Sequence, residues 1–114
     1  NAVEYAIFST DLDRRVTSWN AGAQRLLGYA ESEVLGQSAD LIFVPEDRAA
    51  NAPEKEARTA RSEGRAADER EHLRQDGSRF RGTGTMMLKR NAAGDPVGFV
   101  KILRDLTRTV PQPG

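Results

Sequence analysis

Three short stretches, Trp19-Asn20, Asp76-Gly77-Ser78 and Asp105-Leu106-Thr107, decide how this chain of 114 residues folds. Asn20 lies between a strand pattern and a helix pattern, where its side chain can cap the first free amides of the helix. Asp76-Gly77 joins two extended runs and is typical of a two-residue hairpin turn. Asp105-Leu106-Thr107 closes the last apolar run, so a strand is expected to end there.

Extended segments are predicted on both sides of a helical middle region. The alternation of apolar and polar residues predicts strands over 6–10, 15–19, 70–74, 79–88 and 97–106. Between the second and third strands, apolar spacing and Pro or Gly punctuation predict helices from Asn20, over 31–35, from Pro45 and over 53–63. Two strands, several helices and three further strands indicate an α+β fold with an antiparallel sheet.

Taken together and in this order, the three stretches resemble the PAS domain, in the form found in bacterial sensor histidine kinases. The resemblance covers roughly residues 4–107. It implies a five-stranded sheet in the order 2-1-5-4-3 with the helices on one face. It also implies a sensor or relay domain rather than an enzyme. We therefore assign residues 1–107 to a PAS sensor domain and residues 108–114 to the start of a linker to a downstream signalling domain.

The charge balance argues against several classes of partner. Lys and Arg number 17, as do Asp and Glu, so the formal net charge is zero and no basic field attracts nucleic acid or an anionic membrane. The chain has no Cys, which removes disulfides and thiolate chemistry. No apolar run reaches the length of a membrane span, so we expect no membrane insertion by this segment and a cytoplasmic location.

A candidate ligand site lies on one face of the fourth predicted strand. Gly82 and Gly84 remove side chains from that face, opposite the thin Ala57/Ala60 stripe of the long helix. Either the helix packs closely onto the glycines, or a small cavity remains there for a ligand. The candidate lining residues are Trp19, Ala57, Ala60, Phe80, Gly82, Gly84 and Met86.

No cofactor and no metal are predicted. In PAS domains that bind haem, the resemblance places the ligating histidine on the helix before the third strand, whereas His72, the one histidine, falls on the strand itself and is expected to be partly exposed. The flavin adduct of light-sensing PAS domains needs a cysteine, which is missing. Non-covalent flavin binding stays open, since Trp19 and Tyr29 could stack on a ring. Asp11 and Asp13 are expected to lie in a solvent-exposed turn and not to bind a metal ion.

The expected mechanism is conformational, with the signal leaving through Asp105, Leu106 and Thr107. Arg104 and Arg108 flank this exit and are expected to offer charge partners. Two modes of action remain open: a sensor that binds a small molecule between helices and sheet, or an empty module for dimerisation and relay. Both imply a homodimer through PAS–PAS contacts and a kinase or other effector domain in the same parent chain.

Overall fold

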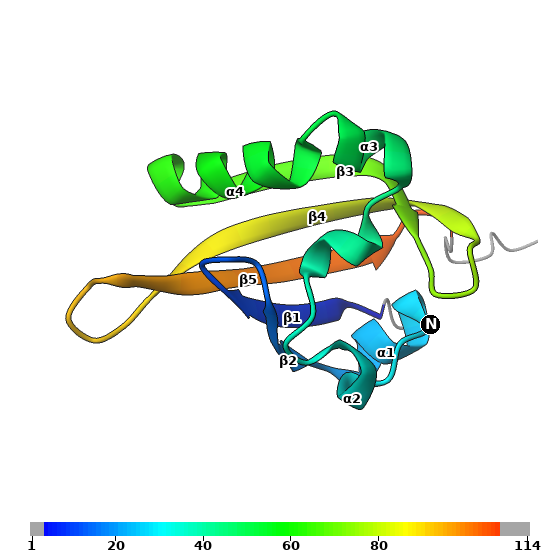
Figure 1. The fold of residues 1–114 in the computed structure, drawn as a ribbon, viewed down its shortest axis with the longest axis horizontal. Coiled ribbons are helices and arrows are strands. Elements are labelled where there is room, and N and C mark those ends of the chain that lie inside the picture. Colours follow the sequence, from blue (N-terminus) through cyan, green and yellow to red (C-terminus); the bar gives the residue numbers. More distant parts are fainter. Residues whose placement is uncertain (1–3, 108–114) are drawn as a thin grey trace, which may run out of the picture.

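The computed structural model of the chain describes residues 4–107, which contain a five-stranded antiparallel sheet (Figure 1). The strands are β1 (Ala6–Asp11), β2 (Val16–Trp19), β3 (Arg65–Leu73), β4 (Arg79–Arg90) and β5 (Pro96–Asp105). They lie in the order β2-β1-β5-β4-β3, which puts the last strand of the chain in the centre of the sheet. The predicted α+β class and strand order are confirmed.

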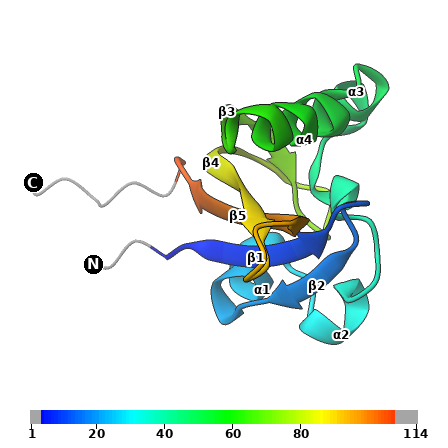
Figure 2. The same cartoon turned by 90° about the vertical axis from the view of Figure 1, so that its left-hand side faces the viewer.

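The helical segments occupy the stretch between β2 and β3. They are α1 (Ala21–Leu27), α2 (Glu31–Val34), the 3-10 helix η1 (Ala39–Ile42), α3 (Pro45–Ala49) and α4 (Ala52–Glu63). The longest of them, α4, runs along β3 and β4, whereas α1 and α2 lie beside β1 and β2 (Figures 1 and 2). Within residues 4–107, no helix has both the length and the apolar character needed to cross a bilayer.

Asn20 joins the first helix to the first strand. Its Oδ1 accepts hydrogen bonds from the amide of Ala23 at 2.7 Å and from the amide of Ile7 at 3.0 Å. Its Nδ2 donates to the carbonyl of Tyr5 at 3.2 Å. The predicted cap is therefore confirmed, and the same side chain also fixes where α1 sits relative to β1.

The hydrophobic core is divided into two clusters of buried residues. One cluster fills the space between α1, α2, η1 and the sheet, and its larger members are Phe8, Trp19, Leu27, Ile42, Phe43, Phe80 and Leu103. The other lies under α4 and consists of Ala57, Ala60, Ala66, Met86 and Phe99. The second cluster has mostly small side chains, so α4 gains little of its attachment from apolar contact.

Two sequence predictions about β3 and its turn are wrong in detail. β3 begins at Arg65, five residues before the predicted start at 70, because Ala66 and Asp68 occupy inward, buried positions of the strand. The hairpin turn between β3 and β4 has a loop of three residues, 75–77, whereas the sequence predicts a loop of two. The amide of Arg74 donates to the carbonyl of Ser78 at 2.9 Å, and the amide of Gly77 donates to the carbonyl of Arg74 at 3.0 Å.

The turn between β4 and β5 has the same geometry as the turn at Gly77. The amide of Asn91 donates to the carbonyl of Asp95, and the amide of Gly94 donates to the carbonyl of Asn91, both at 2.9 Å. Gly77 and Gly94 both have a φ of 87°, in the left-handed region that side chains disfavour. The two glycines therefore carry the same conformational requirement.

We predict that Gly77→Ala and Gly94→Ala destabilise the domain by similar amounts, about 1–2 kcal/mol each, because each forces an L-residue into the left-handed region. Urea unfolding followed by Trp19 fluorescence measures both. Gly77→Asn is the control, since Asn tolerates this conformation better, and it should lose less. A difference above about 1 kcal/mol between the two alanine variants would contradict the shared geometry.

Candidate functional site

A buried group of charges lies between α4 and the sheet, centred on Lys101. The Lys101 side chain projects inward from the central strand β5 and is only 2% exposed. Its Nζ lies 2.5 Å from Oε1 of Glu56 on α4 and 3.2 Å from Oδ2 of Asp68 on β3. Both carboxyl side chains are also buried. One ammonium group thus ties helix α4 and the edge strand β3 to the middle of the sheet.

Gly84 makes room for this group. It is paired directly with Asp68 in the β3–β4 ladder. A Cβ at Gly84 would lie 3.1 Å from Oδ1 of Asp68, 3.1 Å from Cε of Lys101 and 2.8 Å from the carbonyl oxygen of Ile102. Any larger residue at this position would therefore collide with the charged side chains.

Two further side chains extend the group along β3. Arg70 donates from Nε to Oδ2 of Asp68 at 3.1 Å and from Nη1 to Oδ2 of Asp47 at 3.3 Å. His72 Nδ1 lies 3.0 Å from the carbonyl oxygen of Ile42, and because a carbonyl only accepts, Nδ1 carries a proton. His72 is fully buried, with Nε2 3.5 Å from Oδ2 of Asp68. The expectation that His72 is partly exposed is therefore wrong.

The two carboxyl groups are shifted in opposite directions. Burial raises the pKa of Glu56 to about 7, against the attraction of Lys101. For Asp68, burial also favours the neutral form, but the nearby His72 ring and the charge of Lys101 outweigh it and hold the pKa below its usual range. Within residues 4–107, three buried atoms of the group have no hydrogen-bond partner: Glu56 Oε2, Asp68 Oδ1 and His72 Nε2.

Little free space adjoins the charges inside the domain. A cavity of about 10 Å³ touches Glu56, Lys101 and Met86, with Ile42 and Phe43 on its other walls. That volume is about the size of one water molecule. A groove of about 360 Å³ opens to the surface between α4 and β3. Its lining includes Asp47, Glu56 and Arg70, together with the small residues Ala50, Ala52, Ala66 and Ala67.

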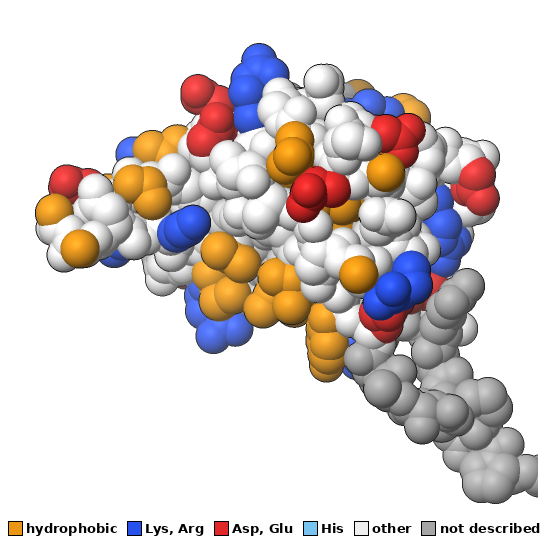
Figure 3. All heavy atoms as spheres, turned by 90° about the horizontal axis from the view of Figure 1, so that it is seen from below, with side chains coloured by type: hydrophobic (Ala, Val, Ile, Leu, Met, Phe, Trp, Pro, Cys, Tyr) orange, Lys and Arg blue, Asp and Glu red, His pale blue; other side chains and the backbone are white. Residues whose placement is uncertain are grey.

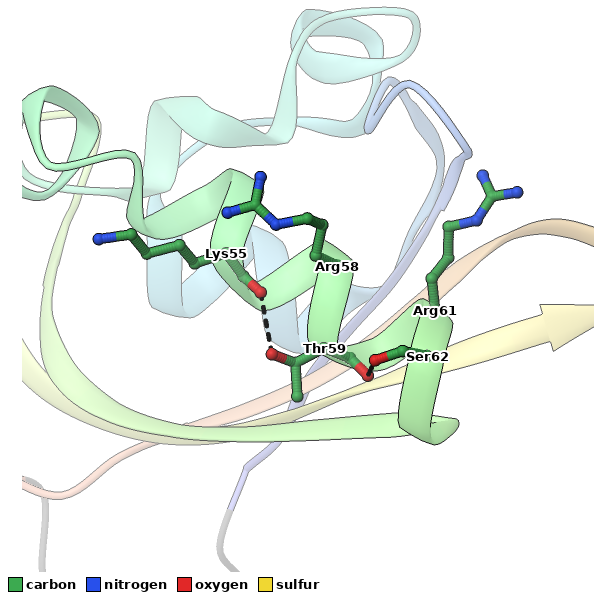
Figure 4. A pocket seen from close by; sticks show the side chains of 5 residues that line it. All are labelled: Lys55, Arg58, Thr59, Arg61 and Ser62. Carbon is green, nitrogen blue, oxygen red and sulfur yellow. Dashed lines mark hydrogen bonds between the residues drawn. The ribbon is translucent and has the colours of Figure 1, made fainter.

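A wider hollow, of about 640 Å³, lies on the outer side of α4 and is formed by that helix alone (Figure 4). Lys55, Arg58 and Arg61 extend from it toward solvent, with Thr59 and Ser62 between them. Because no second element faces these side chains across the hollow, it is an open surface rather than an enclosed site. The buried charges are the better candidate site.

The residues predicted to line a ligand cavity are brought together only in part. Ala57, Ala60 and Met86 pack in the cluster under α4, whereas Trp19 and Phe80 belong to the other cluster. Trp19 donates from Nε1 to the carbonyl of Tyr29 at 2.9 Å and packs against Phe8. A Cβ at Gly82 would lie 3.0 Å from side-chain atoms of both Leu103 and Phe80. The helix and the glycines are thus separated by side chains from neighbouring strands.

The end of β5 is linked to the β3–β4 turn by an ion pair. Asp105 Oδ2 accepts from Nη2 of Arg74 at 2.7 Å, and the two side chains are 4% and 22% exposed. Asp105 Oδ1 also accepts from the amide of Thr107 at 2.8 Å and from its hydroxyl group. Asp105 thus bonds to the chain just beyond the strand, where the sequence predicts that β5 ends. Sequence analysis missed Arg74 as a charge partner at this exit and named Arg104 and Arg108, of which Arg108 lies outside the described residues.

Arg74 contacts two more parts of the domain. Its guanidinium carbon lies 4.6 Å from the centre of the Phe80 ring, and Nε donates to the carbonyl of Leu26 at 3.2 Å. At the end of the same strand, the amide of Leu106 donates to the carbonyl of Arg81 at 2.8 Å. The exit of β5 is thus connected to helix α1, to the turn after β3 and to the core.

Sequence reasoning missed Glu56, Asp68 and Lys101 as a site. One signal was available: Lys101 stands in the middle of an apolar strand, at the spacing that places it on the same face as Phe99 and Leu103. A lysine between two inward apolar residues is rarely buried unless it is paired. Its partners lie far away in the sequence and no comparable signal marks them.

Comparisons with known proteins agree on the fold. A family profile described as PAS fold matches residues 1–106. The Two-component system protein A of Emericella nidulans is 38% identical over 104 residues, which make up 91% of this chain but only 15% of that protein. The chain therefore spans a small part of that relative.

Two solved structures are similar over most of the chain. The PAS domain of a protein from Colwellia psychrerythraea has a TM-score of 0.85 and 26% identity, over 94% of this chain and 90% of that one. An RNA-binding Light-Oxygen-Voltage receptor has a TM-score of 0.73 and 28% identity, over 91% of this chain and 30% of that one.

We predict that Lys101→Met lowers the free energy of unfolding by about 3–5 kcal/mol, because it leaves two buried carboxyl groups without their shared cation. The double variant Glu56→Leu/Lys101→Met should recover most of that loss, since hydrophobic replacement of a buried ion pair is often nearly neutral. Urea unfolding measures both, with the exposed Lys89→Met as control. Wild-type stability in Lys101→Met would refute the structural role of the charges.

Proposed function

The chain belongs to the PAS family, and from this premise we propose that it is the sensory and relay domain of a two-component signalling protein, whose effector is a histidine kinase. The name of the Emericella nidulans relative supports this assignment to two-component signalling. The domain receives a change at its helices or at its dimer contact and passes it on as a shift of the sheet.

The observation that carries the relay role is the contact between Arg74 and Asp105. The strand that leads out of the domain is held at its end by an ion pair to the turn after β3, at 2.7 Å. The same arginine contacts α1 through the carbonyl of Leu26. A movement of the helices or of the β3–β4 hairpin is thus transmitted to residues 105–107, from which the chain continues.

We propose that the domain itself is not catalytic and that the reaction belongs to another part of the parent protein. Its single histidine is buried and uses Nδ1 to hold the carbonyl of Ile42. Among residues 4–107, no cluster of three or more His, Cys, Asp or Glu side chains could hold a metal ion. The parent protein is proposed to act in the cytoplasm.

Of the two modes of action, we favour the relay module without a bound cofactor. The interior cavity next to Lys101 measures about 10 Å³, far below the roughly 300 Å³ or more of typical ligand pockets. The same small volume supports a domain without a bound flavin. Small-molecule sensing is the second candidate, and the groove between α4 and β3 favours it, because Glu56 lies on the wall of that groove.

We also propose that the domain forms a homodimer. Tyr5 and Ile7 at β1 and Val97 on β5 are large hydrophobic residues that remain 40–46% exposed. Figure 3 shows a row of hydrophobic side chains gathered on one face of the molecule, among scattered charges. Burial of such a face against a second copy removes apolar surface from water.

The relay role predicts a specific effect of breaking the Arg74–Asp105 pair. In the full-length parent protein, Asp105→Asn and Arg74→Gln should each weaken the response of kinase output to the stimulus. Their double variant should be no worse than Arg74→Gln alone, because that single change already removes the contact with Asp105. In this chain alone, each should cost about 1.5–3 kcal/mol, the range for a hydrogen bond to a charged group.

The control is Arg81→Gln, which breaks only the exposed ion pair with Glu69 on the same hairpin. It should leave the response intact. Kinase output is compared with and without stimulus for all variants. A normal response in both Asp105→Asn and Arg74→Gln would rule out the proposed route of the signal.

A further inference from the structure

Helix α4 is attached to the sheet partly through the carboxyl group of Glu56, and one oxygen of this group lacks a hydrogen-bond partner. Glu56 is 6% exposed and reaches Lys101 with Oε1, while Oε2 is buried and receives no hydrogen bond. The apolar contacts of α4 with the sheet are made mainly by Ala57 and Ala60. A change at Glu56 therefore acts on the buried ion pair that joins this helix to the central strand β5.

Two carboxyl groups compete for one ammonium group at this point. Glu56 and Asp68 both contact Nζ of Lys101, at 2.5 Å and 3.2 Å. Among the described residues, Glu56 Oε2 and Asp68 Oδ1 are both buried without a hydrogen-bond partner. A protonated Glu56 has a donor to offer to a carboxylate that lacks one. Arg70 lies 3.1 Å from Asp68 but is shared with Asp47, at 3.3 Å. Among the described residues, Glu56 pairs with no cation other than Lys101.

The other charged groups around Glu56 are engaged elsewhere. Across the small cavity, Arg14 of the β1–β2 turn binds Asp40 of η1 at 2.9 Å and Glu54 of α4 at 3.3 Å. On the groove side, Asp47 of α3 binds Arg70, and Lys55 of α4 reaches into solvent. His72 of β3 contacts Asp68, with Nε2 3.5 Å from Oδ2. The surroundings thus supply Glu56 with Lys101 and with one competing carboxylate.

We infer that Glu56 and Asp68 form a proton-binding site, in which one shared proton holds α4 against the sheet. With the proton present, Glu56 donates to Asp68, and the single negative charge that remains is matched by Lys101. When the proton leaves, two buried carboxylates face each other across one ammonium group. Water entering from the groove between α4 and β3 relieves this repulsion, and α4 loosens.

The sign of the pH effect follows from the shift of Glu56. Burial raises its pKa from 4.5 to about 7, so between these values the folded chain binds a proton that the unfolded chain does not. Stability therefore falls as the pH rises from about 4.5 through about 7, and the loss is complete above that range. The lowered pKa of Asp68 acts only in acid, where stability is lost as the pH falls below about 4.

Hydrogen exchange of the α4 amides between pH 5.5 and pH 8.5, corrected for the intrinsic rate, tests this site in the chain as it stands. We expect protection of α4 to fall by at least about tenfold over this range, since each unit of pKa difference is worth a factor of ten. Glu56→Gln, which resembles the protonated acid, should keep α4 protected throughout. Glu63→Gln, an exposed change on the same helix, should behave as the wild type.

Two results would overturn the inference. If wild-type protection does not change with pH, no proton controls α4. If the fall persists in Glu56→Gln, the proton belongs to another group such as His72. Should Glu56→Gln fail to fold, a carbon NMR titration of the Glu56 carboxyl in the wild-type chain decides. A midpoint near 7 supports the site, and a midpoint below about 5.5 refutes it.

Discussion

The contact of Lys101 with Glu56 and Asp68 is the constraint on which the arrangement of this domain depends. β5 is the central strand, and an inward lysine there leaves a charge in the middle of the core that must be neutralised. Glu56 connects α4 to the Lys101 ammonium group, and Asp68 connects β3 to it. The glycine at position 84 follows from the same need, because the charged side chains occupy the space that its side chain would take.

This charged group also explains why the core is split in two. The larger apolar cluster packs under α1, α2 and η1, and the smaller one lies under α4. Polar side chains between them reduce the apolar area available to α4, so this helix is held by charge pairing more than by burial. The region around α1 is held by aromatic packing and by the ties from Asn20 and Arg74. The position of α4 therefore depends on the charge state of buried side chains, whereas the position of α1 depends on packing.

Local features could be predicted from the sequence and long-range pairing could not. The cap at Asn20, the left-handed glycine at position 77 and the strand end at Asp105 depend on neighbours a few residues away, and all are present. Lys101 and Glu56 are 45 positions apart, and Arg74 and Asp105 are 31 apart. Charges are normally solvated, so sequence reasoning gave Lys101 and Glu56 no role and looked for a site among the apolar and small residues. The early start of β3 was missed for the same reason, since Asp68 is unusual inside a strand.

Arg74 has a consequence for how this domain can vary in evolution. One planar guanidinium satisfies a carboxylate, a helix carbonyl and an aromatic face together, and a lysine ammonium lacks the shape to do so. Loss of either Arg74 or Asp105 breaks the ion pair at the end of β5, so single substitutions are selected against more strongly than a joint replacement. Positions 74 and 105 should therefore covary among relatives, and their paired identity marks which domains share this route from hairpin to exit strand.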